Sequence, residues 1–323
     1  MSKPDLLMTG PLRSIVPDQL QERFTLHQLH LAEDREAMLK SIADSVVAIA
    51  TSAFHEPVNA AMIERLPKLK IIGNFGVGYD TVDASYAARR QVYVTNTPDV
   101  LTEEVADTAI GLMIMTVREL GAAERHLRAG NWLNEAYRLT PGTLSGRTLG
   151  IYGLGRIGRA IARRAEAHGM AIRYHARNRV PGAPYPYHAS LRALADAVDT
   201  LMVVVPGTPE TQHAVNMEVL EALGPSGVLI NIGRGTTVDE LALITALQNG
   251  TILSAGLDVF EEEPSVPQAL IDMDHVVLLP HVGSASVHTR DAMGQRVVDN
   301  LFAWLDNKPL ISPVSETPGP YPR

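Results

Sequence analysis

Short apolar runs rich in β-branched residues alternate along the whole chain with stretches of helical length. Gly, Pro or Asn residues bound these runs, as expected for strands. The predicted strands are residues 46–50, 70–72, 92–94, 148–152, 171–174, 201–205, 228–232 and 276–279. Stretches rich in Ala, Leu, Arg and Glu predict helices at 157–168, 238–248 and 287–305. Because the runs are apolar on both faces, the alternation predicts parallel sheets covered by helices on both sides, an α/β architecture.

The size and composition of the chain narrow its class. Its 323 residues predict two domains, and 46% hydrophobic with 20% charged residues suits folded cores rather than disorder. The net charge of 28 − 36 = −8 supplies no basic field for nucleic acid. We find no apolar run near the roughly 18 residues of a membrane span, no secretory signal and no cysteine. We therefore expect a cytoplasmic protein that binds neither nucleic acid nor membrane.

The longest helical stretch runs from Glu103 to Ala129, after a possible N-cap at Thr102 and before Gly130. We expect one helix whose broad apolar stripe is buried between domains or between subunits. The chain end, residues 312–323, is rich in proline and is predicted to be a loose tail.

Three glycines separate the predicted strand 148–152 from the helix that follows it. Gly153 permits a tight turn, Gly155 leaves room for a pyrophosphate, and Gly158 lets the helix approach the strand. The start of the helix would present backbone N–H groups to the phosphates. The pattern therefore predicts a dinucleotide site. Its candidate residues are Gly153, Leu154, Gly155, Arg156, Ile157 and Gly158.

The residues after the next strand indicate which nicotinamide cofactor binds. An NAD site would place Asp or Glu about 20 residues after the first glycine, to bind the ribose 2′-hydroxyl. The chain has no acidic residue between Glu166 and Asp196. Arg177 and Arg179, on either side of Asn178, instead offer guanidinium groups that can pair with a 2′-phosphate. The sequence favours NADP (NADPH) over NAD, the alternative being two solvated surface charges.

Five motifs follow one another in the chain. They are Asn74-Phe-Gly-Val-Gly-Tyr-Asp-Thr-Val-Asp83, Gly153 to Gly158, Asn231-Ile-Gly-Arg234-Gly, Leu257-Asp-Val-Phe-Glu-Glu-Glu263-Pro and Leu279-Pro-His281-Val-Gly. From about residue 68 to 314 the chain resembles the D-isomer-specific 2-hydroxyacid dehydrogenases, especially the glyoxylate and hydroxypyruvate reductases. The resemblance implies two Rossmann-like or flavodoxin-like domains with parallel sheets and a homodimer. A discontinuous substrate-binding domain (1–98 and 288–323) would flank a dinucleotide-binding domain (99–287).

The resemblance also supplies a candidate for each requirement of 2-keto acid reduction. Backbone N–H groups around Val77 and Gly78 would bind the substrate carboxylate. Arg234 would contact that carboxylate and the ketone oxygen, where negative charge develops during hydride transfer. His281 would bind the substrate and donate the proton, because imidazole titrates near neutral pH. Glu263 would fix the imidazole tautomer and favour the imidazolium.

Glu263 further disfavours formate oxidation, since the related formate dehydrogenases carry an amide at this position. Its neighbours Glu261 and Glu262 are interpreted as surface charges. Additional cofactor-binding candidates implied by the resemblance are Val205, Pro206, Thr211 and Asp258. Thr211 has the alternative of capping a helix, and Trp132 and Arg138 could line either the pocket or a dimer contact.

We therefore expect an NADPH-preferring reductase of a small 2-keto acid, with glyoxylate or hydroxypyruvate as the leading substrate and no metal site. Two alternatives stay open. One is a reductase of aryl pyruvates, which needs a roomier pocket. The other is an NAD(P)-sensing regulator, since a transcriptional corepressor shares this fold; the acidic charge argues against direct DNA contact but not against a protein-bridging role.

Overall fold

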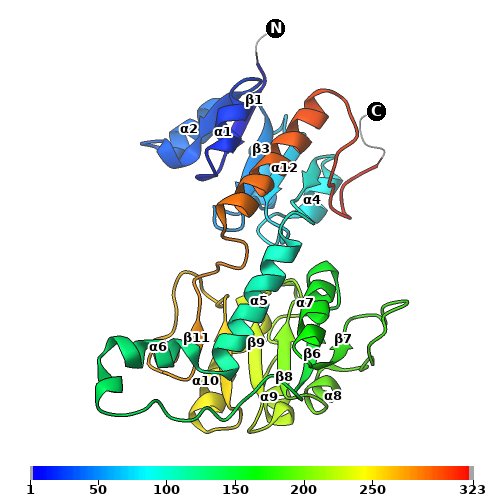
Figure 1. The fold of residues 1–323 in the computed structure, drawn as a ribbon. Coiled ribbons are helices and arrows are strands. Elements are labelled where there is room, and N and C mark those ends of the chain that lie inside the picture. The colour runs from blue at the N-terminus through cyan, green and yellow to red at the C-terminus, as the bar shows by residue number, and fades with distance from the viewer. Residues whose placement is uncertain (1–2, 320–323) are drawn as a thin grey trace. The chain divides into compact units, whose positions relative to one another are not determined.

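The computed structural model describes residues 3–319 and divides the chain into two compact units, each with its own parallel sheet. The first unit joins Met1–Leu101 to Ser286–Arg323, and the second is Thr102–Ala285 (Figure 1). The α/β class with parallel sheets, predicted from the alternating pattern, is confirmed, and so are the two domains, which chain length and the family resemblance predict. Within residues 3–319, no helix has the length and apolar character needed to cross a membrane.

The first unit is built on a five-stranded sheet with the order β2-β1-β3-β4-β5. The strands are β1 (Asp5–Met8), β2 (Thr25–Gln28), β3 (Val46–Ser52), β4 (Ile71–Phe75) and β5 (Tyr93–Thr95). Its helices are α1 (Ile15–Leu20), α2 (Arg35–Ile42), α3 (Ala60–Glu64), α4 (Ala84–Arg89) and α12 (Val287–Leu305). Helix α12 packs directly on β4, since a Cβ on Gly73 would lie 3.1 Å from a methyl group of Val297. The chain therefore returns to the first unit after residue 285, and its helix α12 covers this sheet at β4.

Side-chain caps start many of the helices. Asp34, Asn59, Asp83 and Ser286 each accept a hydrogen bond from the backbone N–H three residues later, at the starts of α2, α3, α4 and α12. These bonds satisfy amides that have no partner inside the helix.

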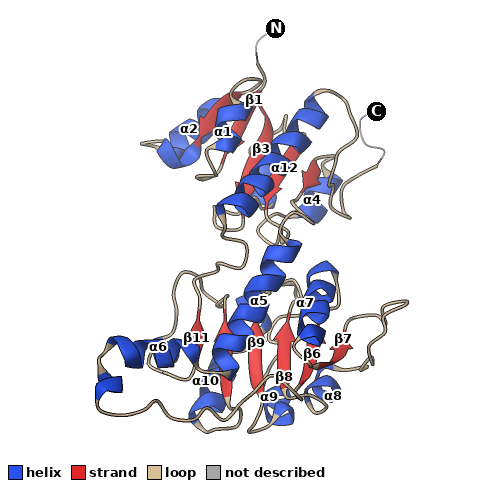
Figure 2. Cartoon of the chain, in the orientation of Figure 1, coloured by secondary structure: helices blue, strands red, loops and turns tan. Residues whose placement is uncertain are grey.

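The second unit has a six-stranded sheet with the order β11-β10-β9-β8-β6-β7 (Figure 2). The strands are β6 (Thr148–Tyr152), β7 (Ala171–His175), β8 (Thr200–Val203), β9 (Val228–Asn231), β10 (Ser254–Leu257) and β11 (Val277–Leu278). Its helices are α5 (Thr102–Val117), α6 (Leu120–Arg128), α7 (Arg156–Ala167), α8 (Leu191–Ala195), α9 (Met217–Leu223), α10 (Glu240–Gln248) and α11 (Gln268–Ile271). Strand order reverses between β6 and β8, and ligands of such sheets bind where the strand order reverses, beyond the carboxyl ends of the strands.

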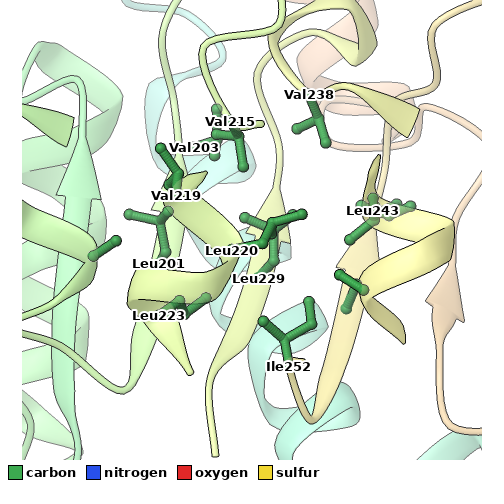
Figure 3. Packing of buried hydrophobic residues seen from close by; sticks show 14 of the residues in the cluster. Leu201, Val203, Val215, Val219, Leu220, Leu223, Leu229, Val238, Leu243 and Ile252 are labelled. Atoms are coloured by element: carbon green, nitrogen blue, oxygen red, sulfur yellow. The ribbon is translucent and has the colours of Figure 1, made fainter. Parts of the chain in front are cut away.

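The core of the second unit explains why its strands are apolar on both faces. On one face, Leu201, Leu229 and neighbouring side chains pack against Val219 and Leu220 of α9 (Figure 3). On the opposite face, a Cβ on Gly256 of β10 would lie 2.3 Å from the Thr116 hydroxyl of α5. Helices thus cover both faces, as the pattern predicts for a parallel sheet.

Three strands were not predicted: β1, β2 and β10. Each has only four residues, and β10 reads Ser-Ala-Gly-Leu, with small side chains and no β-branched residue. The β10 side chains are small because α5 and β9 lie close to the backbone at Gly256. Packing, rather than strand propensity, selects these residues.

The prediction of one long helix from Glu103 to Ala129 is wrong. Helix α5 ends at Val117, and α6 begins at Leu120 after Glu119, whose φ of 51° is left-handed. The Glu119 side chain is buried, where it accepts a hydrogen bond from Tyr137 (3.0 Å) and pairs with Arg138 (2.7 Å). These two partners hold the carboxylate in a position that breaks the helix.

The prediction of a loose tail is wrong for residues 312–317. The backbone of Val314 donates to the oxygen of Val94 at 3.0 Å, and the buried Thr317 hydroxyl bonds both backbone groups of Val94. Strand β5 lies at the sheet edge, and its unpaired backbone groups bind this segment. The last four residues of the predicted tail, 320–323, lie outside the described residues.

Candidate active site

The turn between β6 and α7 fits a pyrophosphate. Gly153 has a φ of 103°, and a Cβ there would lie 2.9 Å from Val205. A Cβ on Gly158 would lie 2.2 Å from the Gly153 oxygen, so the start of α7 lies against the turn. Apart from Gly155 itself and its chain neighbours, no atom within residues 3–319 lies within 4 Å of a Cβ placed on this exposed glycine, which leaves space for a phosphate beside the first amides of α7. Arg156 is exposed and Ile157 half-buried, whereas Leu154 is buried and offers the site its backbone.

The arginines proposed for the 2′-phosphate follow β7 directly. Arg177, Asn178 and Arg179 are all exposed, and the next amide, of Val180, donates to the Tyr174 hydroxyl at 3.0 Å. Hydrogen bonds from Thr208 and from its own backbone, with the nearby charge of Arg177, lower the pKa of Glu210. The loop after β7 therefore lies near the loop after β8.

The loop after β8 is closed by Thr211. Its hydroxyl donates to the Pro206 oxygen at 2.7 Å and accepts from the Thr208 amide at 2.8 Å. The next helix, α9, begins later, with Asn216 as its N-cap, so the helix-cap alternative for Thr211 is wrong. Val205 packs against Gly153, and Pro206 beside it is exposed. This loop and the glycine turn thus lie next to each other.

Arg234 lies in a tightly held loop after β9. Asn231, the last residue of the strand, donates from Nδ2 to the Arg234 oxygen at 2.9 Å and accepts from the Gly233 amide at 3.0 Å. A Cβ on Gly235 would lie 1.8 Å from the carbonyl carbon of Phe260, so only glycine fits there. These contacts fix the backbone that carries the half-buried guanidinium group.

His281 and Glu263 form a direct pair in the second unit. His281 Nδ1 lies 2.7 Å from Glu263 Oε2, and Glu263 Oε1 accepts from the Phe260 amide at 3.0 Å. Burial raises the pKa of Glu263, but the hydrogen bond and charge of His281, the Phe260 amide and the charge of Arg234 outweigh it, so the net shift is downward. The structure thus brings His281, Glu263 and Arg234 together, and Glu263 stays ionised.

Asp258 holds the backbone on which His281 lies. Asp258 is 1% exposed. Its carboxylate accepts from the Val282 amide at 2.7 Å and from the Gly283 amide at 2.8 Å, and its backbone oxygen accepts from the His281 amide at 2.8 Å. Burial raises the pKa of Asp258 and outweighs the opposing hydrogen bonds. The contacts observed for Asp258 therefore support the His281 turn, where φ is 52°.

In the first unit, the loop after β4 presents backbone amides outward. Asn74 donates to the oxygens of Gly76 (3.2 Å) and Gly78 (2.9 Å), Asn96 to that of Val77 (2.9 Å), and the Thr97 amide to Gly76 (2.9 Å). Because N–H and C=O point opposite ways in a trans peptide, the N–H groups of Val77 and Gly78 face away from these donors. These are the two amides that the sequence analysis proposes for the substrate carboxylate.

Sequence reasoning missed the side chains that hold these loops: Asn74, Asn96 and Asn231. Asn74 and Asn231 lie at the carboxyl ends of buried strands, at β4 and β9. Asparagine in this place commonly bonds the backbone of the following turn, and this is the signal that could have found them. Arg138 pairs with Glu119, whereas Trp132 is 67% exposed.

The family profile described as "D-isomer specific 2-hydroxyacid dehydrogenase, NAD binding domain" matches residues 110–283. A hydroxyphenylpyruvate reductase of Plectranthus scutellarioides is 45% identical over 96% of this chain and 98% of its own length. A glyoxylate/hydroxypyruvate reductase of Arabidopsis thaliana is 44% identical, over 97% and 100%. The solved NADPH-dependent glyoxylate/hydroxypyruvate reductase of Sinorhizobium meliloti, in complex with NADP and malonate, superposes with a TM-score of 0.92 at 52% identity, over 100% and 99%.

The chain therefore belongs to the D-isomer specific 2-hydroxyacid dehydrogenases. This confirms the enzyme class expected from the five motifs, an NAD(P)-dependent oxidoreductase of 2-hydroxy acids.

Proposed function

We propose that this protein reduces glyoxylate or hydroxypyruvate to the D-2-hydroxy acid with NADPH. The observation that carries the proposal is the pair of His281 and Glu263, 2.7 Å apart, with the charge of Arg234 acting on the same carboxylate. This constellation lies in the unit whose β6–α7 turn fits a dinucleotide.

The second unit would hold the cofactor, which supplies a hydride when bound. The β6–α7 turn would bind the pyrophosphate through its amides, and Arg177 and Arg179, with Asn178 between them, would bind the 2′-phosphate. Val205, Pro206, Thr211 and Asp258 would border the rest of the molecule. The exposed position of both arginines and the open space at Gly155 support this assignment.

His281 would donate the proton to the ketone oxygen. Because Nδ1 is bonded to Glu263, the proton leaves from Nε2. The ionised carboxylate stabilises the imidazolium before transfer and keeps the ring oriented after it. In the reverse direction the neutral imidazole takes the proton back.

Arg234 and the β4 loop would hold the substrate. A planar guanidinium can bind the carboxylate and the ketone oxygen together, which stabilises charge on that oxygen. In the first unit, the amides of Val77 and Gly78 would bind a substrate carboxylate. On this assignment the first unit is the substrate-binding domain and the second the dinucleotide-binding domain.

A second candidate function is the reduction of aryl pyruvates. It is favoured by the 45% identical relative named as a hydroxyphenylpyruvate reductase. The NADPH-dependent glyoxylate/hydroxypyruvate reductase of S. meliloti is 52% identical and supports the smaller substrates and NADPH.

Steady-state kinetics with glyoxylate, hydroxypyruvate, pyruvate and phenylpyruvate, each with NADPH and NADH, test the proposal. We expect the highest kcat/KM for glyoxylate or hydroxypyruvate with NADPH. A preference for phenylpyruvate would establish the second candidate. Binding of NADPH without turnover of any keto acid would refute both and favour a nucleotide-sensing regulator.

We also propose a homodimer whose contact includes α6 and the segment after it. Leu127, Trp132, Leu133 and Leu139 are between 54% and 94% exposed there, which is typical of a covered apolar surface. Light scattering should report a dimer that Leu133→Glu weakens. Leu31→Glu, at a 67% exposed leucine of the other unit, is the control.

The cytoplasmic location stays a prediction.

A further inference from the structure

A second histidine–carboxylate pair lies in the same unit. His213 Nε2 is 2.5 Å from Glu261 Oε1. Glu261 precedes Glu263 by two residues, and the sequence interpretation of Glu261 as an ordinary surface charge does not account for this contact. His213 lies in the segment between β8 and α9, so the pair joins two parts of the chain that are 48 residues apart.

His213 is attached to the loop that carries Arg234. Its amide donates to the Thr236 oxygen at 2.8 Å, and two residues later the Val215 amide donates to the Thr237 oxygen at 3.0 Å. The segment that holds His213 therefore lies beside the residues that follow Arg234. The His213 side chain links this segment, and with it the Arg234 loop, to Glu261.

Glu261 is in turn attached to the loop that carries Glu263. The Glu261 amide donates to Oε1 of the buried Glu240, in the first turn of α10, at 2.9 Å. The preceding amide, of Phe260, donates to Glu263 at 3.0 Å. Two carboxylates thus hold two consecutive amides, one of them the carboxylate that orients His281.

We propose that His213 and Glu261 are positioning residues for the reduction, whose ion pair fixes the Arg234 loop against the Glu263 loop. The inference rests on the proposed function, in which Arg234 contacts substrate and Glu263 orients the proton donor. A displacement of about 1 Å between groups that act on one substrate can cost on the order of 10²-fold in rate. Neither His213 nor Glu261 needs to touch the substrate.

The charges around His213 extend the pH range of the pair. Glu261 faces it from the acid loop, and Asp239 and Glu240 lie at the start of α10. The hydrogen bond that His213 donates to Glu261 outweighs burial and, with the charges of Glu261 and Asp239, raises the pKa of His213. The imidazolium that attracts Glu261 therefore persists to higher pH than that of an isolated histidine. Above the pKa of His213, the ion pair between His213 and Glu261 weakens.

The test compares Glu261→Gln, His213→Ala and His213→Gln with two matched controls. Glu262→Gln removes the adjacent, exposed charge, and His27→Ala breaks a histidine–aspartate contact of 2.6 Å to Asp5 in the other unit. For each variant, kcat and KM for glyoxylate are measured across pH, together with Kd for NADPH and Tm.

We expect Glu261→Gln and His213→Ala to lower kcat/KM on the order of 10-fold, mainly through kcat, with NADPH binding unchanged. His213→Gln retains a donor that reaches Glu261, so it should recover most of the loss and abolish the alkaline fall in kcat/KM attributed to His213. The two controls should stay within about twofold of wild type, the scale set by the small value of surface charges.

Activity of Glu261→Gln and His213→Ala within twofold of wild type would overturn the inference. So would a loss that only follows a fall in Tm and that His27→Ala reproduces. A wild-type protein that reduces no keto acid would refute the proposed function and this inference together, whereas an active wild type with unaffected variants refutes the inference alone.

Discussion

Replacing Glu263 by glutamine tests the pair of Glu263 and His281, because it changes only one carboxylate oxygen to an NH₂ group. In the native protein one carboxylate oxygen accepts from Phe260 at 3.0 Å and the other from His281 Nδ1 at 2.7 Å. An amide has one acceptor and one donor end. If its oxygen keeps Phe260, its NH₂ group faces Nδ1, which must then give up its proton. In the flipped orientation, two donors face each other at Phe260.

The first orientation removes the acceptor of the imidazolium, and the second keeps that acceptor but leaves the Phe260 amide facing a donor. Both orientations lose the negative charge that stabilises the imidazolium, so Glu263→Gln disfavours the form of His281 that donates the proton. General acid catalysis contributes typically 10²–10⁴-fold, so we expect kcat to fall by at least about 10²-fold. At about 1.36 kcal/mol for each tenfold change, the range corresponds to roughly 3–5 kcal/mol of transition-state stabilisation. NADPH binding should remain, because Glu263 lies outside the glycine turn and the arginine pair.

We also expect the contribution of Glu263 to stability to depend on pH. The pKa of Glu263 is lowered in the folded protein, so its ionised form adds stability that is present above the unfolded glutamate pKa of about 4.3. That contribution is lost as pH falls through the folded pKa. The difference in unfolding free energy between wild type and Glu263→Gln should be largest near neutral pH and shrink in acid.

The assay is NADPH oxidation followed with glyoxylate, with cofactor affinity from fluorescence and stability from urea unfolding. Wild-type kcat in a folded Glu263→Gln variant would refute the reasoning, because the pair would then have no part in proton donation. A parallel loss of NADPH affinity would instead point to a wider disturbance of the site.

Further substitutions probe the other groups. His281→Ala should lower kcat on the order of 10²-fold or more with little change in Kd for NADPH, and near-normal turnover would exclude it as proton donor. Arg177→Ala with Arg179→Ala should raise KM for NADPH but leave KM for NADH nearly unchanged; equal effects would refute phosphate binding. Arg234→Lys should reduce kcat/KM strongly because a bidentate contact is lost, and full activity would show that none exists. Gly158→Ala places a Cβ 2.2 Å from a backbone oxygen, so the unfolding free energy should fall by about 1–3 kcal/mol, and unchanged stability in urea would contradict the close contact.

The sequence alone determined the features that follow from local pattern. Alternation of apolar runs and helices predicted the parallel sheets, because a strand that is buried on both faces has a continuous apolar run rather than alternating apolar and polar residues. Glycine spacing predicted the β6–α7 turn, since a Cβ at Gly153 or Gly158 would lie too close to nearby backbone atoms. The family motifs pointed to His281, Glu263 and Arg234, which the structure brings together in one unit.

The tertiary structure decided what depends on contacts between distant segments. Glu119 interrupts a sequence that is helical by composition, because Tyr137 and Arg138 bind its carboxylate. Residues 312–317 pack along β5 because a sheet edge needs partners. The pairing of His213 with Glu261 spans 48 residues and has no local signature. Residue patterns reflect neighbours along the chain, whereas these features arise from neighbours in space.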